Sequence, residues 1–189
     1  MAERLTLARQ LNEKAARQRL GRLGAHTLEP AWVALWAAPL GLPGKPPGAW
    51  LLGAEEMRRA LLLTGTELPA QAEQPGPGIQ LTGATPPAYE AIRRLWLWER
   101  IATPRLWRIQ ALDIPPTPVW LPCWLGYRAG RQHQLTVISG LSGEVLSMLK
   151  ALILGGLADA FRHAQTPGEK ACSPSDIIQE ERKSIGTRV

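Results

Sequence analysis

The chain has little phenylalanine, tyrosine, histidine and cysteine: one Phe, two Tyr, three His and two Cys among 189 residues. Two cysteines, Cys123 and Cys172, are too few for a disulfide framework, and neither lies at a spacing typical of metal ligands. The three histidines are also far apart in the sequence. We therefore expect no bound metal and no cofactor, and the scarcity of cysteine favours a reducing compartment.

A long apolar run is also lacking. No segment supplies the roughly 18–20 uncharged apolar residues that a membrane-spanning helix needs. The most apolar stretch, residues 30–44, contains three prolines. The opening residues, MAERLTLARQ, lack the apolar region of a secretory signal. These absences predict a cytoplasmic protein, with no membrane expected among its partners.

Tryptophan and arginine are abundant instead. Each of the eight tryptophans can bury roughly 150–250 Å², so a few of them are expected to dominate a core or an interface. The net charge of +6 is concentrated in residues 1–24, which hold six basic groups against two carboxylates. Helix-forming residues around these groups predict a basic amphipathic helix over 2–23. The six basic groups are Arg4, Arg9, Lys14, Arg17, Arg19 and Arg22.

Chain-breaking residues and hydrophobic periodicity divide the sequence into five parts. They are a basic helical arm (1–24), a strand–helix module (25–65), a Pro/Gly-rich linker or loop (66–87), an α+β core (88–163) and a polar tail (164–189). In the second part, the patterns predict strands over 32–38 and 49–52 and a helix over 54–63.

The α+β core carries the clearest order of elements. Its patterns predict a helix from 86 to 102, a meander of three strands over 106–112, 119–127 and 133–139 with a polar turn at 129–132, and a helix over 144–163. The fold class is therefore predicted to be α+β, with a small antiparallel sheet, covering helices, a basic N-terminal helix and a flexible C-terminal tail.

Four apolar residues of this core are candidates for contact with a partner. Alternation along the strand over 119–127 places Trp120 and Trp124 on the face opposite Cys123. The apolar stripe of the helix over 144–163 is wide, and adding Leu146 and Leu154 leaves apolar surface beyond what the sheet can cover. Trp120, Trp124, Leu146 and Leu154 are accordingly predicted to bind a partner.

Two glycine-containing segments partly match phosphate-binding or RNA-binding motifs, but their patterns predict turns. The segment 41–45 lacks the spacing of a phosphate-binding loop, and Pro46 occupies the position of its hydroxyl residue. The segment from Gly140 to Gly143 matches a bare GxxG, but a strand precedes it and its loop is not basic. We interpret it as the turn that leads into the last predicted helix.

These patterns favour a non-catalytic bacterial binding or scaffold protein, which contacts a protein partner or a second copy through the Trp-rich sheet and the apolar helix. A first alternative is a non-specific nucleic-acid-binding protein, whose six N-terminal basic groups would neutralise phosphates. A second is a small enzyme with Cys123 as nucleophile and His133 nearby on the paired strand. A cysteine among apolar strand residues is more typical of packing, so no catalytic residue is assigned.

One further pattern lies in the α+β core. It consists of LPCWLGY from Leu121 to Tyr127, LTVI at 135–138, Gly143-Glu144 and Lys150. It resembles small uncharacterised bacterial proteins that have a Pro-x-Trp-[VIL]-Gly-[FY] strand followed by a hairpin and a helix. The resemblance covers about 40 of the 189 residues. It implies this local arrangement and no activity, so no residue is assigned a function from it.

Overall fold

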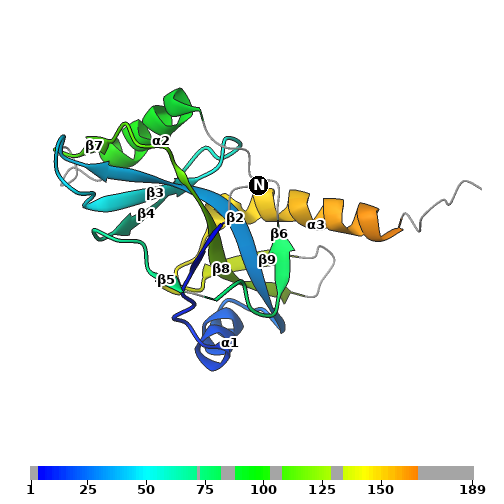
Figure 1. The fold of residues 1–189 in the computed structure, drawn as a ribbon. Helices are drawn as coiled ribbons and strands as arrows, with labels where there is room; N and C mark the ends of the chain where they lie inside the picture. The colour runs from blue at the N-terminus through cyan, green and yellow to red at the C-terminus, as the bar shows by residue number, and fades with distance from the viewer. Residues whose placement is uncertain (1–3, 72, 82–87, 103–107, 129–133, 166–189) are drawn as a thin grey trace, which may run out of the picture. The chain divides into compact units, whose positions relative to one another are not determined.

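One sheet of nine strands and three α-helices make up the described part of the chain in a computed structural model (Figure 1). That part comprises residues 4–71, 73–81, 88–102, 108–128 and 134–165, without the side chains of 161 and 163–165. Backbone contacts divide the chain into two units, residues 1–157 and 158–189, and the sheet lies in the first. The elements are β1 (Leu5–Leu7), α1 (Glu13–Arg22), β2 (Thr27–Gly41), β3 (Ala49–Gly53), β4 (Leu61–Thr64), β5 (Ala70–Gln71), β6 (Ile79–Leu81), α2 (Tyr89–Ala102), β7 (Gln110–Ala111), β8 (Thr117–Arg128), β9 (Gln134–Ser139), the short 3₁₀ helix η2 (Ser147–Leu149) and α3 (Lys150–Gln165).

The long strands β2 and β8 form the centre of the sheet. They pair antiparallel from Thr27 opposite Tyr127 to Ala37 opposite Thr117. The main strand order is β4-β3-β2-β8-β1-β5, while β6 and β7 also pair with β2 and β9 pairs with β8. The pairs β1–β8 and β2–β6 are parallel. The predicted α+β class is confirmed, but the sheet is mixed and larger than the small antiparallel sheet we expected.

Both faces of the central strands are covered. Residues 31–35 of β2 and 119–126 of β8 are all buried, although successive side chains point to opposite faces. Helix α1 packs Ala16 and Leu20 against Trp124 and Ile138. Helix α2 packs its inner face on another part of the sheet, and Figure 1 shows the two helices at different ends of it. The main core cluster also includes Leu149 and Ile153, at the end of η2 and in α3.

Several predicted elements are confirmed. The helix expected from 86 to 102 is α2, and the strands expected over 32–38, 49–52, 119–127 and 133–139 are β2, β3, β8 and β9. Of the strand expected over 106–112, the described residues form only β7. The predicted turn at 129–132 lies outside the described residues, as does the tail from 166 onward.

Three helix predictions were wrong in whole or in part. Within the helix expected over 2–23, residues 5–7 form β1, and α1 begins only after Asn12, whose side chain caps it by accepting from the amide of Ala15 at 2.9 Å. Within the helix expected over 54–63, residues 61–63 belong to β4 and pair with β3. The helix expected from 144 begins later, as η2 at Ser147 and as α3 at Lys150. At β1 and β4, pairing with another strand overrides local helix propensity, and before η2 the residue Val145 bridges β9 instead of joining a helix.

The predicted linker over 66–87 contributes two strands to the sheet. Ala70 and Gln71 form β5 beside β1, and residues 79–81 form β6 beside β2. Gly78 allows the chain to approach β2 at this point, because its φ is +138° and an added Cβ would lie 2.6 Å from the carbonyl oxygen of Pro30. None of the helices in the described ranges is both long and apolar enough to cross a membrane.

Candidate docking surface on helix α2

Two arginines of the predicted basic arm are stacked on tryptophans of the sheet. The guanidinium carbon of Arg9 lies 4.5 Å from the ring centroid of Trp32 and 4.6 Å from that of Trp124. Its Nη2 also donates to a β2 carbonyl at 3.2 Å. Arg4 lies over Trp120 in the same way, at 5.3 Å. These contacts place flat cations against electron-rich ring faces and fasten the segment around β1 to the sheet.

The other basic groups of the arm lie on α1. Arg19 donates to the carbonyl of Gly143 at 3.0 Å and so ties α1 to the turn after β9. Arg17 forms an exposed ion pair with the preceding turn of the helix. Lys14 and Arg22 are exposed. Four of the six predicted nucleic-acid-binding groups are therefore engaged within the chain, and the six do not form one free cationic surface.

Three of the four predicted partner-binding residues are buried. Trp120 is 9% exposed, Trp124 is 5% exposed and Leu146 is 1% exposed, whereas Leu154 is exposed. The indole N–H of Trp124 also donates to the carbonyl of Leu11 at 3.0 Å. The structure does not bring these four residues together on one accessible surface.

Cys123 is a buried core residue of β8. Its side chain is fully buried, and burial raises the pKa of its thiol to about 12. The thiolate, which is the nucleophilic form, is therefore scarce at neutral pH. His133, the partner suggested by the sequence, lies outside the described residues. Among the residues that are described, no group of three or more His, Cys, Asp or Glu is placed to hold a metal ion.

The outer side of α2 carries bulky apolar residues that the sheet does not cover. Its inner side buries Ile92, Leu95, Trp96 and Glu99 among others. On the outer side, Leu97 is 53% exposed, Trp98 is 57% exposed and Ile101 is 59% exposed. The sequence contained this signal: once the buried face of the helix is assigned by its period, Leu97, Trp98 and Ile101 remain outside it.

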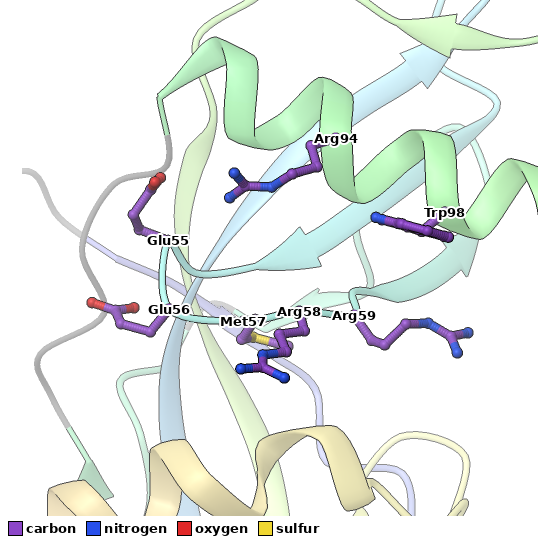
Figure 2. Close-up of a pocket in the computed structure, with 7 residues that line it drawn as sticks. All are labelled: Glu55, Glu56, Met57, Arg58, Arg59, Arg94 and Trp98. Atoms are coloured by element: carbon purple, nitrogen blue, oxygen red, sulfur yellow. The ribbon is translucent and has the colours of Figure 1, made fainter.

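A cleft of about 520 Å³ lies between α2 and the segment over 55–59. Figure 2 shows that Arg94 and Trp98 reach into it from the helix, while the residues of the opposite wall come from that segment. The lining residues are Glu55, Glu56, Met57, Arg58, Arg59, Arg94 and Trp98. The sequence pattern did not indicate this cleft, because it predicts a helix over 54–63.

The two walls of the cleft are fastened to each other at both ends. Near the start of α2, the carboxylate of Glu55 accepts from the backbone N–H of Ala88 at 3.1 Å, a group that has no partner within the helix. Near its end, Arg59 donates to both carboxylate oxygens of Glu99, at 2.7 and 3.2 Å. This hydrogen-bonded contact raises the pKa of Arg59. The framework of the cleft is thus fixed before anything binds.

Two cationic side chains of the cleft are free for a ligand. Within the described part of the chain, the guanidinium groups of Arg58 and Arg94 form no hydrogen bond or ion pair, and the indole of Trp98 is more than half exposed. We call Arg58, Arg94, Leu97, Trp98 and Ile101 the α2 docking surface. It offers two unpaired cations beside an apolar patch.

Comparisons with known proteins add nothing to this geometry: no family model, curated protein or solved structure matches the chain. A functional assignment must therefore come from the arrangement of its own residues.

Proposed function

We propose that the protein is a non-catalytic binding module, and that it holds an acidic, apolar segment of a partner protein on the α2 docking surface. The observation that supports this proposal is the set of exposed Leu97, Trp98 and Ile101 beside the unpaired Arg58 and Arg94. Tryptophan and arginine are the residues most enriched at binding hot spots. We place the contact here because Trp120 and Trp124 are buried.

The chemistry of the cleft favours a protein segment over nucleic acid. A phosphate backbone carries a negative charge at every nucleotide, so it would meet the carboxylates of Glu55 and Glu56 as well as the arginines, whereas a protein segment can carry its acidic residues at the arginines alone. Leu97 and Ile101 offer no stacking surface for a base, whereas they suit apolar side chains. An acidic residue of the partner would pair with Arg58 or Arg94 at the rim, while its apolar residues cover Trp98.

A cytoplasmic location belongs to the same proposal. Cys123 is a free cysteine in the core, where its thiol packs without a disulfide partner. Such a residue is compatible with the reducing compartment that the cysteine content predicts.

The proposal can be tested with short fluorescent peptides in a binding titration followed by anisotropy. One peptide alternates Leu or Trp with Glu or Asp, and its counterpart carries Lys at the acidic positions. We expect the acidic peptide to bind more tightly, with a further loss at high salt. Trp98→Ala should weaken binding by about tenfold or more, since exposed aromatic anchors dominate such contacts.

Matched controls distinguish binding at this surface from non-specific binding elsewhere on the protein. Ile114→Ala removes another exposed apolar residue, 51% exposed and outside the docking surface, and should leave binding unchanged. Arg22→Ala removes an exposed basic group of α1 and should also have no effect. Equal binding of the acidic and basic peptides, or binding of neither, would contradict the proposal. Tight, salt-sensitive binding of a single-stranded oligonucleotide that survives Trp98→Ala would favour the nucleic-acid alternative.

A further inference from the structure

Strand β4 presents an apolar edge that carries no charge and no proline and that no segment among the described residues covers. It ends the main path of the sheet, and among the described strands it pairs with β3 alone. Its flanks and body, residues 60–65, read ALLLTG and contain no charge and no proline. Leu61, Leu62 and Leu63 are only half-buried. Natural edge strands are usually protected by charges, proline or a covering segment, so an unprotected edge is a template for pairing.

The edge of β9 shows what such protection looks like in this fold. The side of β9 away from β8 is covered by the segment that follows it: Val145 bridges Ile138, and the amide of Leu146 donates to the carbonyl of Val137 at 2.8 Å. This contact satisfies a backbone group that would otherwise be open at the edge. No described segment makes the corresponding contact with β4.

The direction of the free backbone groups on β4 follows from one hydrogen bond. Gly65 donates its N–H to the carbonyl of Gly48 at 3.1 Å, so residue 65 points its backbone groups toward the β3 side. Backbone direction alternates along an antiparallel strand. The backbone N–H and C=O groups of Leu61 and Leu63 therefore point toward β3, whereas those of Leu62 and Thr64 point outward.

We propose that this edge of β4 pairs with β4 of a second copy of the chain, antiparallel and across a two-fold axis. Only residues whose backbone groups point outward can form the hydrogen-bonded pairs of the new ladder, and the residues between them face each other as non-hydrogen-bonded pairs. In a register that satisfies this rule, Leu62 of each copy lies opposite Thr64 of the other, and the two Leu63 residues lie opposite each other. Each Leu62–Thr64 pair then exchanges two hydrogen bonds, and the half-buried leucines lose their remaining exposure.

Charge on either side of β4 also favours the antiparallel arrangement. Arg58 and Arg59 precede the strand, and Glu67 follows it. The two-fold axis brings Glu67 of each copy opposite Arg59 of the other, with Arg58 adjacent. Arg58 and Glu67 are both exposed and form no ion pair with the described residues. A parallel pairing would place like charges together, so the second copy fits in one direction only.

Sedimentation velocity over a range of protein concentrations tests this pairing. The wild type is expected to show a monomer–dimer equilibrium. Thr64→Pro removes an outward N–H that makes no bond to β3, so it should raise the dimer Kd by about tenfold or more without changing the circular dichroism of the monomer. Thr64→Lys adds a charge to the edge and provides a second route to the same loss. In hydrogen exchange, the amides of Leu62 and Thr64 should gain protection as the concentration rises.

Two controls give the test its specificity. Thr27→Lys places the same charge on an exposed residue of β2 and should leave the Kd unchanged. Trp98→Ala should also leave it unchanged, because Arg58 is the one residue that this pairing shares with the α2 docking surface and Trp98 takes no part in it. A wild type that stays monomeric at every concentration would overturn the proposal. So would a dimer that both Thr64 variants leave intact, or one that is lost in Trp98→Ala instead.

Discussion

The stack of Arg9 between Trp32 and Trp124 is expected to contribute measurably to stability. Each arginine–indole contact at this distance is worth roughly 0.5–2 kcal/mol. The hydrogen bond to the carbonyl of Ala31 adds about 1 kcal/mol. Burial lowers the pKa of Arg9, which means that desolvation of the cation offsets part of this gain. We expect Arg9→Ala to lower the free energy of unfolding by about 2–3 kcal/mol.

Urea unfolding, followed by circular dichroism and tryptophan fluorescence, measures this loss. Arg9→Lys retains the charge but loses the flat guanidinium that fits between two rings, so it should lose about 1–2 kcal/mol. Arg22→Ala, on an exposed face of α1, should change stability by less than about 0.5 kcal/mol. If Arg9→Ala and Arg22→Ala unfold at the same urea concentration, the stack does not support the sheet and our reasoning is wrong.

Three further predictions concern the core and the cleft. Gly126→Ala should lower the free energy of unfolding by about 1–3 kcal/mol in urea unfolding, because the new Cβ would lie 2.7 Å from Leu20 Cδ2. An unchanged unfolding midpoint would show that α1 can move away from β8 without loss of stability. Stability should fall as pH rises from about 9 to about 12, because burial raises the pKa of Cys123 from 9.0 to about 12 and the unfolded chain loses its proton first. Melting curves across this range should show a smaller fall for Cys123→Ala, and an equal fall would contradict the assignment. Glu99→Ala removes the carboxylate partner of Arg59, so it should lower the free energy of unfolding by about 1–3 kcal/mol in urea unfolding and should also weaken peptide binding. A variant that keeps both its stability and its peptide binding would contradict this role of Glu99.

Local sequence patterns were sufficient to predict those helices and strands whose structure agrees with the propensity of their own residues. Alternation from Val119 to Tyr127 predicted β8, and the helical period after Thr85 predicted α2. It failed at Leu61–Leu63, where a run of leucines continues a helix-forming sequence without alternation. Their partners on β3 lie about ten residues away, and pairing decides the structure. The same holds for β1, whose neighbours in the sequence are good helix formers.

The candidate site was less predictable than the fold. A basic N-terminal segment looks the same in sequence whether its arginines are free or stacked, because the rings under Arg4 and Arg9 belong to β2 and β8. Trp120 and Trp124 were correctly placed on one face of their strand. The sequence did not reveal that α1 and the arginines cover this face. The α2 docking surface depends on the turn over 55–59, which no periodicity indicates.

The parallel pairing of β1 with β8 has a consequence for how the protein folds. Leu5 lies opposite Val119, so these two strands are separated by most of the chain. Closing so long a loop is slow and must precede any gain from the contact. During synthesis, β1 cannot pair with β8, and Arg4 and Arg9 cannot reach Trp120 and Trp124, until β8 has left the ribosome, whereas β5 and Trp32 are made much earlier. The first strand to be made therefore gains its central partner only late, and the stack on Trp124 completes the sheet rather than nucleating it.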